Sequence, residues 1–197
     1  MALFLVTAPS LEPVTLVEAK RHCRVDTPDE DALIESLIKA AREYVESATH
    51  RPLMRQTWDW KLDEFPCGSD DRLVLPLPPV SSITSVTYVD TAGTTQTWTA
   101  SLYRTSLPAG PKAGPATIEP AYGEGYPSTR GLSDAVTVRF VCGYGTTVET
   151  VPSSLRAAIK LLVSHWYVRR EPVNVGNLVS PIPLTITALV WPYMAFR

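Results

Sequence analysis

The sequence has few of the residues that build metal and redox sites. Among 197 residues there are three cysteines and three histidines. The cysteines form no C-x-x-C pair, and the histidines fall in neither an H-x-x-x-H nor an H-E-x-x-H pattern. We therefore predict no metal and no cofactor, and three reduced thiols: Cys23, Cys67 and Cys142.

Long apolar runs and an excess of one charge are also missing. No stretch approaches the ~20 apolar residues that a membrane-spanning helix needs. No basic residues precede the apolar start, MALFLVT, as they do in a signal peptide. The formal net charge of −2 lacks the basic excess of a free nucleic-acid binder. The composition is that of an ordinary globular protein, and we predict no membrane association.

Catalytic motifs are absent from the sequence. The carboxylates of Glu30 and Asp31, and of Asp70 and Asp71, are adjacent, so each pair points apart on a helix or is solvated in a loop. Residues 123–125 (GEG) and 143–145 (GYG) lack the Lys-Ser/Thr of a phosphate-binding loop. No G-x-S-x-G occurs. We predict that the protein is not an enzyme.

Aromatic residues are concentrated in stretches with the two-residue period of strands. They are Trp58, Trp60, Tyr88, Trp98 and Tyr103. Aromatics in such strands pack in a sheet core or as cross-strand pairs more often than they form an exposed platform for sugars or bases. A carbohydrate- or ligand-binding module that uses such a platform is the alternative function.

The strongest periodic pattern predicts a long helix over residues 151–170. Its apolar residues recur at i, i+3, i+4, i+7, i+8, i+11 and i+12 and form one wide stripe: Leu155, Ala158, Ile159, Leu162, Val163, Trp166 and Tyr167. Pro152 suits the first turn, Ser153 or Ser154 can cap it, and Pro172 stops the helix. Such a stripe needs apolar partners elsewhere in the chain.

Two further helices are predicted in the first fifty residues. Thr15 and Glu18 form a capping box in front of a short helix. A longer helix runs from Asp29 to His50 and carries two apolar stripes. One stripe consists of Leu33, Leu37, Ala40, Tyr44 and Ala48, and the other of Ile34, Ile38, Ala41 and Val45. We expect this helix to pack on two sides, against the first helix and the late one.

The intervening segment has the alternating pattern of strands. Strands are predicted at 56–62, 73–75, 83–89, 94–98 and 136–140, with weaker candidates at 103 and 117–119. Residues 90–93 form a turn between two of them. Residues 1–14 are expected to be extended.

The order of elements predicts an α+β fold. Two N-terminal helices and one long late helix form a small helical bundle, with an inserted β-strand domain and an extended C-terminal arm. The ranges are 1–50 for the N-terminal helices, 51–150 for the β domain, 151–170 for the bundle helix and 171–197 for the arm. A short helix is expected within the arm, at 185–191. The arm is too apolar for a solvated terminus, so it docks on its own fold or on a partner.

A series of short motifs resembles the head–tail connector (adaptor) proteins of tailed bacteriophages. Residues 16–25 (LVEAKRHCRV) resemble the family's opening, and 29–46 continue it. The later motifs are QTW at 56–58, the proline step at 75–80 with 85–90, GYG at 143–145 ahead of 151–159, and ALVWPY at 188–193. No single motif is specific, but the ordered set covers nearly the whole chain. Cys23 and Met194 stand where leucine and arginine are usual in the family.

The resemblance implies a structural protein of the virion, assembled in the host cytoplasm and found also in phage-like gene transfer agents. Such connectors form a ring, usually of twelve subunits, under the portal. The ring extends the DNA channel and joins the capsid to the next connector or tail protein. The implied partners are the portal protein, further copies of the chain, and a stopper or tail-terminator protein on the other side. DNA passes through the lumen without specific binding, which suits the near-neutral charge.

The resemblance also implies that the C-terminal segment embraces the portal. We therefore predict that large apolar residues there bind the portal, because large aromatic side chains dominate interface energetics. They are Leu184, Ile186, Leu189, Trp191, Tyr193 and Phe196. Folding of this segment onto the late helix is the alternative. A ligand-binding module of a phage particle and a phage-encoded hydrolase are the two competing functions.

Overall fold

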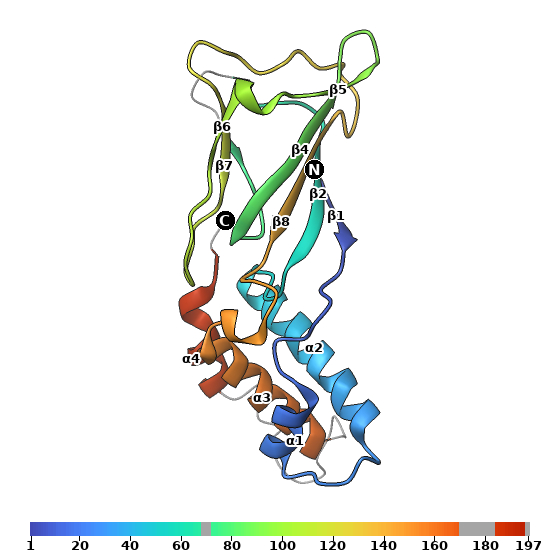
Figure 1. The fold of residues 1–197 in the computed structure, drawn as a ribbon, viewed down its shortest axis with the longest axis vertical. Helices are drawn as coiled ribbons and strands as arrows, with labels where there is room; N and C mark the ends of the chain where they lie inside the picture. The colour runs from blue at the N-terminus through green and yellow to red at the C-terminus, as the bar shows by residue number, and fades with distance from the viewer. Residues whose placement is uncertain (68–71, 170–183, 196–197) are drawn as a thin grey trace. The chain divides into compact units, whose positions relative to one another are not determined.

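The chain divides into two compact units. The computed structural model describes residues 1–67, 72–169 and 184–195 (Figure 1). The strand unit comprises Met1–Pro9 and Arg55–Tyr144, and the helical unit comprises Ser10–Met54 and Gly145–Arg197. Within the described residues there are four α-helices and two antiparallel sheets, which confirms the α+β class.

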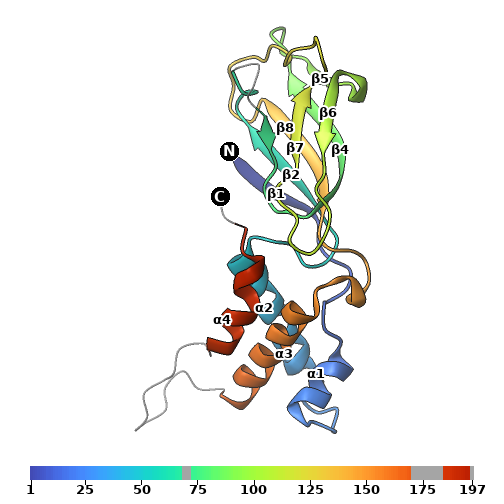
Figure 2. The ribbon, with the colours of Figure 1, turned by 90° about the vertical axis from the view of Figure 1, so that its left-hand side faces the viewer.

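The strand unit contains a five-stranded and a three-stranded antiparallel sheet (Figure 2). The order of the larger sheet is β1-β2-β8-β4-β5, with bounds Ala2–Thr7, Gln56–Leu62, Val136–Cys142, Val80–Val89 and Thr95–Thr97. The smaller sheet has the order β3-β7-β6, with bounds Leu73–Val74, Thr117–Pro120 and Tyr103–Ser106. The central strand β8 pairs with both β2 and β4 over seven partner positions each. The strand predicted at 136–140 therefore lies at the centre of the larger sheet.

The first strand was predicted only as an extended segment. β1 is antiparallel to β2, with Leu3 opposite Trp60 and Phe4 opposite Asp59. Figure 1 shows this blue strand beside β2. Its residues read as a continuous apolar run, which has no period that would mark a strand. Long-range pairing thus places the first nine residues in the strand unit, whereas the sequence grouped them with the helices at 1–50.

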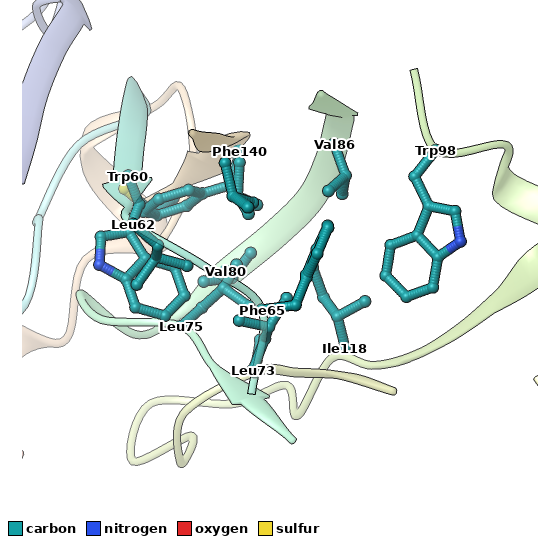
Figure 3. Close-up of a cluster of buried hydrophobic side chains, with 14 residues drawn as sticks. Trp60, Leu62, Phe65, Leu73, Leu75, Val80, Val86, Trp98, Ile118 and Phe140 are labelled. Atoms are coloured by element: carbon teal, nitrogen blue, oxygen red, sulfur yellow. The ribbon is translucent and has the colours of Figure 1, made fainter. Parts of the chain in front are cut away.

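Side chains of both sheets share one buried cluster (Figure 3). Strands β2, β4 and β8 supply residues from the larger sheet, and β3 and β7 supply residues from the smaller one. They include Trp60, Leu62, Val80, Val86, Val138, Phe140, Leu73 and Ile118. Phe65, which follows β2, stacks on Tyr126 with ring centroids 5.2 Å apart and meets Trp98 edge-on at 5.4 Å. Aromatic burial of this kind dominates the energetics of a core.

Replacing Phe65 with alanine should destabilise the strand unit strongly. The side chain is buried, so its loss removes apolar contacts and leaves a cavity. Together these effects should lower the free energy of unfolding by about 3–5 kcal/mol. Urea unfolding followed by tryptophan fluorescence measures this. Phe4→Ala is the matched control, because Phe4 lies half-exposed on β1. Equal losses in the two variants would contradict the assignment of the core.

The helical unit begins with a helix whose start follows from local chemistry. α1 spans Leu16–Cys23, and Thr15 and Glu18 form the predicted capping box: the Thr15 hydroxyl accepts from the Glu18 N–H, and the Glu18 carboxylate accepts from the Thr15 N–H. Arg24 ends the helix in the left-handed conformation. The prediction of this helix is confirmed.

The next helix packs mainly through one of its two apolar stripes. α2 spans Asp31–Thr49 and contacts α1 and α3. The stripe that begins at Ile34 is buried, whereas Leu33 and Tyr44 of the other stripe are partly exposed. Tyr44 meets Trp166 of the late helix edge-on, with ring centroids 6.3 Å apart. The helix begins two residues after the predicted Asp29.

The late helix, α3, spans Ser153–Val168 and carries the predicted stripe. Leu155, Ala158, Ile159, Leu162 and Val163 are buried, and the helix contacts α1, α2 and α4. The predicted cap is wrong. Pro152 occupies the N-cap position without a side-chain bond, so neither Ser153 nor Ser154 caps the helix. The proline lies one residue before the position expected for it.

Ion pairs surround this apolar core. The guanidinium of Arg42, which is buried on α2, donates Nε to Glu12 at 2.7 Å and Nη1 to Glu46 at 2.6 Å. The other carboxylate oxygen of Glu46 accepts the Leu53 N–H at 2.7 Å. Glu12 lies before α2 and Leu53 lies after it. These hydrogen bonds therefore hold both flanking segments to the helix.

A second ion pair joins α3 to the start of α1. Arg156 donates Nη2 to Glu18 at 2.5 Å and Nε to the Pro13 carbonyl at 3.2 Å. Burial raises the pKa of the Glu18 carboxyl, but the Thr15 N–H and the Arg156 guanidinium outweigh it and hold the pKa below its ordinary value. The folded state therefore favours the charged form of the Glu18 carboxyl.

The Glu18→Gln variant should show a weaker loss of stability in acid. A carboxyl whose pKa is lowered on folding contributes stability above its ordinary pKa of about 4.3, and this contribution is lost as the pH falls through the folded-state pKa. The variant should be less stable than the parent at pH 7, and the two should converge as the pH falls below about 4.3. Urea unfolding between pH 7 and pH 3 measures this.

Glu35→Gln is the control for that titration, since it removes one negative charge from an exposed position on α2. If both variants gave the same difference from the parent at every pH, Glu18 would not be the residue responsible.

Candidate partner-binding surface

The C-terminal end of the described chain packs on the helical unit. α4 spans Leu184–Val190 and contacts α3 and α2. Ile186 and Val190 lie four residues apart, so they share one helix face, and both are buried. The helix expected at 185–191 is thus confirmed. A 3-10 turn, Trp191–Tyr193, follows it.

Hydrogen bonds fix the segment that follows α4. The buried Arg51 donates Nε to the Tyr193 carbonyl at 2.6 Å. The Ala195 N–H donates to the Thr49 carbonyl at 2.9 Å, and the Ser154 hydroxyl donates to the Tyr193 hydroxyl at 2.9 Å. A hydrogen bond from a charged donor is roughly twice as strong as one between neutral groups. Residues 184–195 are therefore an integral part of the helical unit.

The six residues predicted to bind the portal lie in different environments. Ile186 is buried in its own unit, and Tyr193 is half-buried and hydrogen-bonded. Leu184 and Trp191 are 87% and 59% exposed. The other two are half-buried or outside the described residues: Leu189 and Phe196, respectively. Two large apolar side chains thus face solvent beside a segment that is firmly held.

The aromatic residues of the strand unit form a core. Trp60 and Trp98 are buried, and Trp58, Tyr88 and Tyr103 pack against the same cluster. Figure 3 shows the two buried indoles among aliphatic side chains. Their interpretation as sheet core is therefore confirmed. The platform on which the ligand-binding alternative rested is not formed by these residues.

The polar motifs of the sequence have structural partners where the structure describes them. Asp31 accepts a hydrogen bond from Lys20 at 2.5 Å, and Glu30 accepts one from the Tyr167 hydroxyl. Asp70 and Asp71 lie outside the described residues. Across residues 1–67, 72–169 and 184–195, no three His, Cys, Asp or Glu side chains are grouped so that they could hold a metal ion. No helix in these ranges is long and apolar enough to span a bilayer.

The sequence did not identify a partly exposed apolar run in β1. Phe4, Leu5 and Val6 are consecutive residues of β1, and each is roughly half-exposed. Their run of apolar character was visible, but an edge position in a sheet depends on which strands pair. Only the tertiary structure shows that this run lies at the edge of the larger sheet.

Comparison with known proteins gives the same family as the sequence motifs. Residues 13–84 match the family described as phage gp6-like head-tail connector protein. This match starts before α1 and ends within β4, so it includes parts of both units. The resemblance to head–tail connector proteins is therefore confirmed. No curated protein matches this chain by sequence.

Solved structures extend the similarity to the full chain. One is the neck of an empty gene transfer agent (GTA) particle computed with C6 symmetry, and another is the virion of a native GTA particle. A chain in each is 25% identical to this protein with a TM-score of 0.80, over 100% of this chain and 97% of that chain. The neck of a native GTA particle computed with C12 symmetry contains a chain with 24% identity and a TM-score of 0.79.

Replacing Arg51 with alanine should loosen the C-terminal segment. The change removes the charged donor to the Tyr193 carbonyl, which should lower the free energy of unfolding by about 2 kcal/mol. Limited proteolysis should also cut the variant sooner near its C-terminus. Arg55→Ala is the control, because Arg55 is exposed. Unchanged stability and cleavage in Arg51→Ala would contradict the anchoring described above.

Proposed function

We propose that this protein is a structural head–tail connector that joins a capsid to its tail in a phage or phage-like particle. The observation that carries the proposal is the similarity to a chain of the GTA neck over 100% of this chain and 97% of that one. Because the match is end to end, it includes both compact units and the C-terminal segment. The family match over residues 13–84 gives the same role independently.

The connector forms a ring under the portal, with twelve copies as the family resemblance implies. In this role it extends the DNA channel and offers a surface to a stopper or tail-terminator protein on the other side. The cyclic symmetry used for the similar GTA necks supports a ring. The formal net charge of −2 supports passage of DNA without specific binding, since affinity for phosphates grows with each neutralising contact.

The C-terminal segment binds the portal in this proposal. Leu184 and Trp191 have exposed apolar side chains that a partner can cover. Aromatic residues that become buried on binding dominate the energetics of interfaces. Ile186 and Tyr193 act indirectly, because their contacts with the helical unit hold the exposed pair in place. The binding surface is thus presented by a folded segment, which reduces the entropy lost on binding.

Trp191→Ala and Leu184→Asp should each weaken binding to the portal protein from the same genome at least about tenfold. Co-sedimentation of the full chain with assembled portal measures this. Point variants are preferable to deleting α4, because the deletion would remove Ile186 and Val190 from the core of the helical unit. Both variants should keep the thermal midpoint of the parent.

Tyr122→Ala is the matched aromatic control, since Tyr122 is fully exposed in the strand unit. It should bind like the parent. If the parent chain failed to bind the portal, the connector function would be wrong. If the parent bound and both C-terminal variants bound equally well, the function would stand and the portal contact would lie elsewhere.

A further inference from the structure

The outer edge of β1 carries an apolar surface that the described chain leaves uncovered. β1 is the terminal strand of the larger sheet, and among the described residues only β2 pairs with it. Phe4, Leu5 and Val6 are 49%, 48% and 45% exposed. We name this surface, the outer side of β1 with these three residues, the β1 edge.

Apolar side chains project from both faces of the sheet at this edge. Phe4 lies opposite Asp59, and its ring is 4.9 Å from the Lys61 ammonium. Leu5 lies opposite Trp58, whose side chain packs against the core cluster, so Leu5 belongs to the other face. Val6 falls at a register shift between Leu5 and Thr7. A partner that covers the edge would therefore bury side chains on both faces.

The backbone restricts what such a partner can be. An edge strand presents N–H and C=O groups that no neighbouring strand satisfies, and soluble proteins usually protect such edges with lysine, proline or a covering element. At positions 4–6 of β1 the protein has apolar residues instead. Exposed apolar edges of this kind pair with an extended segment of another chain.

A ring provides that other chain as a second copy. In a cyclic assembly each subunit contacts its two neighbours through two different surfaces. The strand order of the larger sheet places β1 at one edge and β5 at the opposite edge, where Thr95–Thr97 is exposed throughout. Among the described residues the sheet thus has two different open edges, one for each neighbour. The neck that contains the similar chain was computed with cyclic symmetry.

We propose that the β1 edge is a contact between neighbouring copies of this connector in its ring. In the ring, the neighbouring copy covers Phe4, Leu5 and Val6, and it does so with a surface that is not its own β1. This inference rests on the proposed function, and it assigns one of the two surfaces that a ring requires.

A photo-crosslinking probe at position 4 tests the contact directly. Phe4→p-benzoyl-L-phenylalanine keeps an aromatic side chain in place. The probe-carrying chain is mixed with an excess of nitrogen-15-labelled parent chain, both alone at high concentration and with the portal, and is then irradiated. Mass spectrometry identifies the captured peptide. We expect labelled connector peptides from outside Ala2–Thr7.

Each other outcome overturns the inference. Capture of labelled Ala2–Thr7 peptides would indicate a symmetric pair of edges, and such a pair does not build a ring. Capture of portal peptides alone would assign the edge to the portal, and no intermolecular capture in either sample would leave it without a partner. Co-sedimentation of the same samples with the portal reports on the proposed function separately.

A charge on the edge should reduce the capture. Leu5→Lys in the probe-carrying chain should lower the yield of labelled peptide about tenfold, because a half-exposed leucine loses its apolar contact. Leu132→Lys is the matched control, since Leu132 is also 48% exposed in the strand unit. It should leave the yield within about twofold of the parent. Equal effects of the two variants would overturn the inference.

Discussion

Burial of the apolar stripe of α3 is the interaction on which the helical unit depends. Five of its residues are inaccessible to solvent, and α3 contacts α1, α2 and α4. The strand segment separates α1 and α2 from α3 in the sequence, so these contacts form only when the chain returns to its starting region. Contacts between residues so distant in sequence make the closure of the helical unit a costly step in folding, since loop closure must precede the contacts that reward it.

Charged residues set the geometry around that apolar core. Arg42 joins Glu12 and Glu46, Arg156 joins Glu18, and Arg51 binds a backbone carbonyl. Removing a carboxylate partner of the buried Arg42 leaves a charge with fewer partners, which costs more than the pair itself contributes. These interactions therefore favour a single arrangement of loops and helix ends more than they add to stability.

The proposed role in assembly needs surfaces that are presented rigidly, and the structure offers two of different kinds. The exposed pair Leu184 and Trp191 lies on a segment that is held by buried contacts. The β1 edge belongs to a sheet that packs one of its two faces into a large core cluster. The full-length similarity at 25% identity shows how such a framework persists while most side chains differ, because cores tolerate apolar exchanges that preserve volume and pattern.

The sequence by itself determined the elements that depend on local interactions. The capping box of Thr15 and Glu18 is a contact between near neighbours, and the stripe of α3 and the alternation of β2 and β8 are periodic patterns within short segments. The ordered motifs likewise led to the connector family, which the comparisons confirm. Capping residues and periodic patterns are visible in a few consecutive residues, so each of these elements could be recognised without knowledge of the fold.

Only the tertiary structure decided where the apolar segments of ambiguous pattern lie. The run in β1 became an edge strand because it pairs with β2. In α2 one of two similar stripes is buried, since α1 and α3 pack on that side. At the C-terminus Ile186 is buried while Trp191 is exposed. The hydrophobic effect is non-directional, so the identity of an apolar side chain determines neither which neighbour covers it nor which of several similar side chains is left exposed.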